Sequence, residues 1–140
     1  RDFCLSRGLG DVYKRQPSHL TATGRAILSA LPRNQVRALY PNRQAFTDRT
    51  GIGPKSPKEL EATLAETQRT GFAEEHGDVT PGFDSYAVAV RDYNDFPIAG
   101  LALTFVSGSL RPEQERSLKT KLRLAGTELS RRLGAVGSLT

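Results

Sequence analysis

The sequence holds few side chains that could form a catalytic centre. Ser85 could serve as a nucleophile, with Glu75, His19 or His76 as a base. However, Ser85 lacks the Gly-x-Ser-x-Gly turn that presents many serine nucleophiles, and two histidines without cysteine or aspartate at ligand spacing make a poor metal site. The simpler expectation is that His19 packs beside a helix or contacts its cap, and that His76 is a solvated loop residue. We therefore expect no catalytic residue, no metal and no cofactor, with a small-molecule enzyme as the alternative.

Two predicted strands, residues 85–90 and 98–106, suggest a binding surface instead. A two-residue turn at positions 94–95 would set the pairing of these strands, and alternate side chains would then share a face. One face is large and apolar: Tyr86, Val88, Val90, Leu101, Leu103 and Phe105. The other is small, with the pairs Ser85 and Thr104, Ala87 and Ala102, and Ala89 and Gly100.

The small face has two explanations that composition leaves open. Because interiors are closely packed, alanine and glycine either admit a helix backbone or leave a ligand cleft with Ser85 and Thr104 at its rim. Both hold if a helix covers one end of the face and a ligand the other. The room that these small residues leave favours an aromatic or branched ligand over a two- or three-carbon one.

A predicted helix start bears on this choice. Thr21 or Thr23 can cap the helix, and its first residues, through Ala22 and Gly24, are small. The first N–H groups of a helix lack partners within the helix, so an anion could approach them directly. The alternative is an ordinary capped helix. Since no lysine or arginine lies between Thr70 and Val90 in the sequence, these N–H groups are the expected anion partners.

Periodicity and turn residues predict the remaining elements. The first helix ends at Pro32, and a second, short one ends before Pro41. A helix capped by Ser56, with Pro57 first and Glu59 completing a capping box, runs to Gly71. We expect loops at residues 42–55 and 76–84, a short strand at 72–75, and a C-terminal helix that ends at Gly134 with the apolar stripe Leu118, Leu122, Ala125, Leu129 and Leu133.

Composition fits one globular domain. The chain has 140 residues, 37% of them hydrophobic and 25% charged. It has no apolar run near the roughly 20 residues of a membrane span, and its one cysteine fits a reducing compartment, so we expect a cytoplasmic protein without membrane contact. The net charge of +5 raises the possibility of nucleic-acid binding, but glutamates interrupt the basic residues of the last helix and no helix-turn-helix pattern is present.

Residues 1–16 differ from the rest. They read RDFCLSRGLGDVYKRQ, show no helical or strand period, and resemble a translated sequencing-adapter remnant. We expect this segment to be non-native and the folded domain to comprise residues 17–140.

Four motifs together resemble the C-terminal, effector-binding domain of the IclR family of bacterial transcriptional regulators. They are His19-Leu20-Thr21-Ala22-Thr23-Gly24-Arg25-Ala26, Gly71-Phe72-Ala73-Glu74-Glu75, the run from Pro81-Gly82 to Asp92, and the strand end at residues 101–108. The resemblance implies an α+β, GAF-like fold, an antiparallel sheet flanked by helices. It also implies that the N-terminal winged helix-turn-helix, through which the family contacts DNA, and the first strands of the domain are absent, which leaves the sheet truncated.

The resemblance also implies a binding site. The family's pocket uses backbone N–H groups at the helix start, an acid, a Cys or Ser, and two residues of the last strand. Carried over to this chain, these positions are Ala22, Thr23, Glu75, Ser85, Ala102 and Thr104. The expected ligand is a small organic acid, and the expected assembly is a homodimer or homotetramer.

Overall fold

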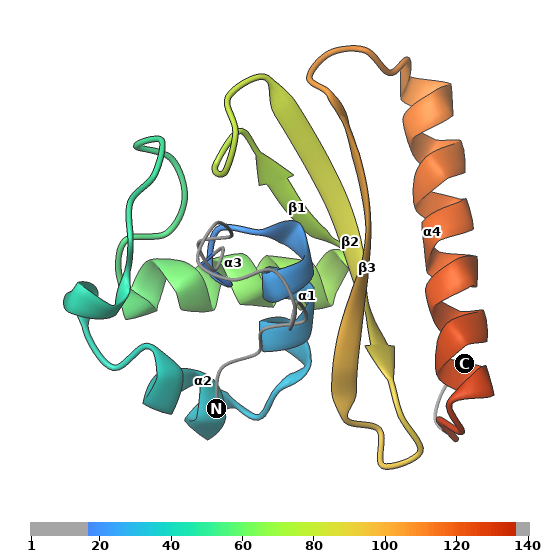
Figure 1. Ribbon diagram of the computed structural model, residues 1–140, viewed down its shortest axis with the longest axis horizontal. Coiled ribbons are helices and arrows are strands. Elements are labelled where there is room, and N and C mark those ends of the chain that lie inside the picture. The colour runs from blue at the N-terminus through green and yellow to red at the C-terminus, as the bar shows by residue number, and fades with distance from the viewer. Residues whose placement is uncertain (1–16, 137–140) are drawn as a thin grey trace, which may run out of the picture.

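The computed structural model describes residues 17–136 of the chain (Figure 1). These residues form an antiparallel sheet flanked by helices, which confirms the expected α+β fold. The elements in chain order are α1 (Ala22–Ala30), α2 (Arg33–Leu39), the 3-10 turn η1 (Arg43–Ala45), α3 (Pro57–Thr70), β1 (Ala73–His76), β2 (Phe83–Arg91), β3 (Pro97–Val106) and α4 (Pro112–Arg132). The expectation about residues 1–16 lies outside the described residues.

α1 and α3 follow their local signals. Thr21, rather than Thr23, caps α1 by accepting a hydrogen bond from the Gly24 N–H at 3.0 Å. Ser56 caps α3, and Gly71 ends it with φ of 79°, a conformation that glycine adopts at no steric cost. The predicted capping box is only half formed, because the Glu59 carboxylate accepts from the Lys55 N–H at 2.7 Å instead of turning back to Ser56.

The three strands form a sheet in the order β1-β2-β3, with both neighbouring pairs antiparallel. The turn between β2 and β3 has three residues, so the predicted two-residue turn is wrong. Asp95 adopts φ of 58°, and the Asp92 N–H donates to the Phe96 carbonyl at 3.0 Å, as in common three-residue hairpins. A bulge after Val90 absorbs the additional residue, so the predicted register of the rest of the hairpin is retained.

The two faces of the sheet carry different helices (Figure 1). α4 lies against the large apolar face, which confirms the predicted division of side chains between the faces. The cluster there comprises Phe72, Tyr86, Val88 and Leu122, with Leu101, Leu103 and Phe105 packed against it. α1 lies against the small face and α3 packs beside α1, where Leu28, Leu31, Leu60 and Leu64 form a second apolar cluster.

The contact line of α4 differs from the predicted stripe. Leu122, Gly126 and Ser130 are the buried residues of this helix, whereas Leu129 and Leu133 are 40% and 44% exposed. The reason is close packing at a glycine, since a methyl group at position 126 would lie only 2.5 Å from a methyl carbon of Val88. The helix therefore turns Leu122 and the small residues Gly126 and Ser130 toward β2, whereas Leu129 and Leu133 stay partly exposed.

Candidate functional site

Two adjacent rows of paired residues cross the small face of the sheet. In the polar row, Ser85 of β2 pairs with Glu75 on β1 and with Thr104 on β3. In the alanine row, Ala87 pairs in the same way with Ala73 and Ala102. Because alternate residues of a strand share a face, both rows are directed toward the side on which α1 lies. The structure thus brings together the four predicted site residues of the strands.

The Ser85 and Thr104 hydroxyl groups are hydrogen-bonded to each other, with their oxygen atoms 2.9 Å apart. Ser85 is buried and Thr104 is exposed. Because each hydroxyl has one hydrogen and accepts at its lone pairs, this bond uses one of the two hydrogens and leaves the other to donate elsewhere. The prediction that these two residues are cross-strand neighbours is confirmed, and the pair can serve a polar ligand as donor and as acceptor.

Glu75 completes the polar row with a buried carboxyl group. Its side chain is directed to the same face as Ser85, and its Oε1 accepts a hydrogen bond from the Val79 N–H at 3.1 Å. This bond ties the loop between β1 and β2 to the row. The loop therefore limits access to the acid and fixes the orientation of one of its oxygens.

The start of α1 lies on the alanine row, which neighbours the polar row, because Ala22 packs there on Ala73 and Ala87. α1 runs toward the β2–β3 turn, so its N-terminus is directed to the opposite end of the sheet (Figure 1). Thr21 caps the Gly24 N–H, and within residues 17–136 no hydrogen-bond acceptor is found for the N–H groups of Ala22 and Thr23. Among the described residues, the two at the helix start that the sequence assigns to ligand binding are therefore those whose N–H groups have no acceptor.

The alanine row is occupied by α1 itself. Ala22 and Ala26 pack on Ala73 and Ala87, with Ala89 and Ala102 at the margin of the cluster. A methyl group at position 100 would lie 2.9 Å from Thr23 Cβ, so Gly100 is what permits this approach. Of the two explanations for the small face, close approach of a helix therefore accounts for the packing at the alanine row and at Gly100, and the polar row remains the place expected for a ligand.

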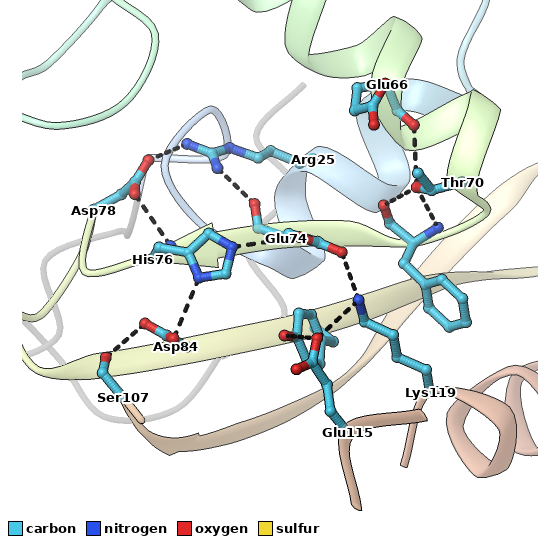
Figure 2. A network of polar contacts seen from close by, with 12 residues as sticks. Arg25, Glu66, Thr70, Glu74, His76, Asp78, Asp84, Ser107, Glu115 and Lys119 are labelled. Carbon is cyan, nitrogen blue, oxygen red and sulfur yellow. Dashed lines mark hydrogen bonds and ion pairs between the residues drawn. The ribbon is translucent and has the colours of Figure 1, made fainter. Parts of the chain in front are cut away.

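A buried ion pair beside the site was missed by the sequence analysis. The Arg25 guanidinium pairs with the carboxylate of Asp78 in the β1–β2 loop, and both side chains are almost fully buried (Figure 2). Arg25 Nε also donates to the His19 carbonyl at 2.8 Å, and Nη1 donates to the Glu74 carbonyl at 2.7 Å. The sequence stretch between Thr70 and Val90 has no lysine or arginine of its own, but α1 places Arg25 against Glu74 and Asp78, and each nitrogen of this guanidinium already has a protein acceptor.

The sequence did contain a signal for this pair. Arg25 lies three residues after Ala22 and next to Ala26, on the helix face whose other members are small and apolar. A charged residue on such a face is seldom fully buried without a partner. The partner itself could not be identified, because it lies 53 residues further along the chain.

The comparisons with known proteins agree with this geometry. Residues 7–131 match the family model described as bacterial transcriptional regulator IclR C-terminal. The chain belongs to this family. It is 32% identical over 136 residues to the glycerol operon regulatory protein of Streptomyces coelicolor, covering 93% of this chain and 51% of that protein. It is 29% identical to the regulator XynR of Escherichia coli, covering 88% of this chain and 48% of that one.

Solved structures of IclR-type proteins share the fold. The repressor BlcR of Agobacterium tumefaciens superposes with a TM-score of 0.79 at 29% identity, over 89% of this chain and 50% of that one. The present chain spans about half the length of the relatives it matches. The IclR C-terminal fold is thereby shown for the described residues.

The two histidines of this IclR domain lie apart from Ser85. His19 is buried between the rings of Tyr40 and Phe46, and its Nε2 lies 2.8 Å from the Thr47 carbonyl oxygen. Burial, which outweighs this hydrogen bond, lowers the pKa of His19 and keeps its ring neutral. His19 therefore has the packing role that was expected for it.

His76 is the last residue of β1 and not a loop residue, so the expected location is wrong, whereas its side chain is exposed to solvent as expected. Its ring lies between Glu74 and Asp84, with nitrogen-to-oxygen distances of 3.3 Å to each (Figure 2). Burial of His76 opposes its protonation, but the two carboxylates outweigh burial and raise its pKa. Since β1 directs His76 to the opposite face from Glu75, no histidine stands beside Ser85 as a base.

Neither a metal site nor a membrane span is found in the described part of the chain. Residues 17–136 contain no group of three or more His, Cys, Asp or Glu side chains placed to hold a metal ion. None of the helices described there is long and apolar enough to cross a bilayer.

Proposed function

We propose that this IclR domain is the ligand-sensing part of a transcriptional regulator and that it binds a small organic acid. The observation that carries the proposal is the polar row of Glu75, Ser85 and Thr104 on the face that the start of α1 covers. This arrangement offers the helix-start N–H groups and a hydroxyl hydrogen to a carboxylate. Anions are favoured at a helix start because the helix dipole adds to the hydrogen bonds.

Each residue has a distinct role in this proposal. The N–H groups of Ala22 and Thr23 and the Ser85–Thr104 hydroxyl pair donate to the carboxylate, and Ala102 borders the ligand on the side of the alanine row. Glu75, whose side chain is buried, accepts a hydrogen bond from a hydroxyl of the ligand. Because α1 fills the alanine row, a compact acid is favoured over the aromatic or branched one that the small residues suggested.

The remaining parts of the regulator's action follow from the family. We infer that DNA is contacted through an N-terminal winged helix-turn-helix outside this chain, that the protein acts in the bacterial cytoplasm, and that it assembles as a homodimer or homotetramer. DNA binding by α4 is disfavoured, because part of its positive charge is already paired with acids. Arg131 and Arg132 both bond Glu128, and Lys119 bonds Glu74 and Glu115.

The test is calorimetric titration of the 140-residue chain with a panel of small acids. Ala102→Phe should abolish binding of the best acid by filling the space beside the polar row. Ser85→Ala should weaken binding by about 1 kcal/mol, the contribution of one neutral hydrogen bond. Thr120→Val removes an exposed α4 hydroxyl and serves as the control, which should bind the acid as the unmodified chain does.

Circular dichroism separates loss of binding from loss of folding. If Ala102→Phe folds and still binds the best acid as tightly as the unmodified chain, the ligand binds elsewhere and the site is wrong. If Ser85→Ala and Thr120→Val have the same effect on affinity, the hydroxyl pair has no part in binding.

A further inference from the structure

Away from the polar row, a cavity lies between α2, α3 and the end of α1. Its volume is about 570 Å³, within the range of about 300–1,000 Å³ that is usual for small-molecule pockets. Four buried leucines form its floor: Leu28, Leu31, Leu60 and Leu64.

α2 forms the opposite wall of the cavity, and its side chains are not packed closely against the leucines. None of its residues is buried, and no side chain caps its N-terminus. Val36, together with Tyr40 at the end of the helix, faces the leucines but stays only half-buried. Figure 1 shows α2 set apart from the layer formed by α1 and the sheet. An apolar guest between the two walls would bury the side of α2 that the protein leaves incompletely covered.

The mouth of the cavity carries more positive than negative charge. Arg33, Arg37 and Lys58 line it together with one acid, Glu61. Arg33 Nε donates to Glu61 Oε1 at 2.6 Å, and an Arg37 Nη2 donates to the same oxygen at 3.4 Å. Hydrogen bonding to Arg33 lowers the pKa of Glu61, which therefore stays ionised at the mouth.

The Glu61 carboxylate leaves several N–H donors of Arg33 and Arg37 without an acceptor among the described residues. Each guanidinium has five N–H groups, and a single Glu61 oxygen receives the bonds from both arginines. Glu61 holds Arg33 and Arg37 side by side, which is the arrangement that suits a second, incoming carboxylate. The cavity thus combines an apolar interior with a cationic mouth.

We propose that this cavity binds an amphipathic organic anion, with its hydrocarbon part among the leucines and its carboxylate on Arg33 and Arg37. The proposed site shares no residue with the polar row, so it would give the domain a second, independent ligand. A ligand bound there would also hold α2 against α1 and α3.

The probes are octanoate, octan-1-ol and octylamine, titrated calorimetrically against the 140-residue chain. Octanoate should bind about tenfold more tightly than octan-1-ol, as expected for one charge-assisted interaction, and octylamine should bind least. The double variant Arg33→Gln/Arg37→Gln should remove the preference for octanoate and leave octan-1-ol unaffected. Both arginines are largely exposed, so the fold should tolerate their replacement.

A matched pair of α3 variants locates the site. Ala65→Phe places a ring in the cavity and should abolish octanoate binding, whereas Ala62→Phe adds the same ring at an exposed α3 position that does not line it. The proposal is overturned if octanoate does not bind, if Ala65→Phe binds it as Ala62→Phe does, or if the double arginine variant weakens octanoate and octan-1-ol equally. Ala102→Phe in the polar row should leave octanoate binding intact, which separates this proposal from the effector site.

Discussion

The two faces of the sheet hold their helices by different means. α1 is held on the small face by backbone contact at Gly100 and by the buried pair of Arg25 and Asp78. α4 is held on the large face by apolar side chains around Leu122 and by half-exposed ion pairs of Lys119. Contacts of the first kind fix a helix closely, because backbone atoms and a buried charge pair tolerate little displacement.

The difference corresponds to the roles of the two faces. A site that uses the N–H groups of Ala22 and Thr23 requires the start of α1 to keep a fixed distance from the polar row. The small face provides this constraint, since α1 approaches the strand backbone and Arg25 ties α1 to the β1–β2 loop. α4 carries no proposed ligand contact, and flexible side chains on the large face are sufficient for its attachment.

Breaking the buried pair should have the largest effect on stability. Arg25→Met leaves the Asp78 carboxylate buried without its partner, which should destabilise the fold by about 3–5 kcal/mol. Arg69→Met, which breaks the exposed pair of Arg69 with Glu66, is the control and should cost less than about 1 kcal/mol. Urea unfolding followed by circular dichroism measures both.

A second variant keeps this test informative if Arg25→Met does not fold. Arg25→Met combined with Asp78→Asn removes both charges and keeps an oxygen to accept the His76 N–H. The double variant should recover part of the lost stability. Equal midpoints for Arg25→Met and Arg69→Met would show that the pair does not hold α1.

Adding one methyl group to each close-contact glycine compares the two faces directly. At Gly100 the new carbon would meet Thr23 Cβ at 2.9 Å and the Thr23 carbonyl oxygen at 3.1 Å, so α1 itself must move. Gly100→Ala should therefore cost about 1–3 kcal/mol. At Gly126 the obstacle is a methyl group of Val88, and the gain in helix propensity of up to about 1 kcal/mol offsets much of the strain.

Acid binding provides a second measurement for the same pair of variants. Gly100→Ala should weaken binding of the best acid, because it displaces the helix-start N–H groups from the polar row. Gly126→Ala should leave that affinity unchanged. If the two variants lose equal stability and equal affinity, the small face places no special constraint on the site.

Local patterns predicted much of this fold. Ser56, Gly71 and the alternation along β2 and β3 each act over a few residues, and the structure has the cap, the helix end and the pairing of Ser85 with Thr104 that they indicate. The turn length was wrong, but the bulge after Val90 compensated for it. The predicted pairing, which rests on the two-residue alternation along β2 and β3, was therefore correct although the predicted turn length was not.

The remaining features depend on what lies opposite each segment. Alanine and glycine on the small face show that volume is missing, but not whether a helix or a ligand fills it, and only the position of α1 decides this for the alanine row. The predicted stripe of α4 was right at Leu122 but wrong at Ala125, Leu129 and Leu133 for the same reason, because Gly126 and Ser130 face β2 instead. Asp78 could not be assigned to Arg25 from spacing, since the two are distant in the sequence.

The smallest expected effect concerns the two histidines, whose pKa values are shifted in opposite directions. The raised pKa of His76 means that the folded state holds this proton more tightly than the unfolded state. Its contribution to stability is fully present below the ordinary histidine pKa of about 6.5 and is lost as the pH rises through the folded-state value. The lowered pKa of His19 has the opposite consequence, since folding is weakened as the pH falls below about 6.5.

His76→Gln removes the stabilising effect of His76 at low pH and leaves the opposing effect of His19 on the free energy of unfolding. The variant should lose stability relative to the unmodified chain at about pH 5.5, and lose less at about pH 7.5, on the two sides of the ordinary histidine pKa. Because the His76 side chain is 54% exposed, the difference should be below about 1 kcal/mol. Urea midpoints at the two pH values measure it, with Gln68→Ala as a control that changes no titrating group.

Since His76 belongs to the network on the large face, acid binding at the polar row should be unaffected at both pH values. A loss of stability that is the same at both pH values would mean that the ion pairs of His76 with Glu74 and Asp84 do not act on folding, and a parallel loss of acid affinity would mean that the two faces are coupled.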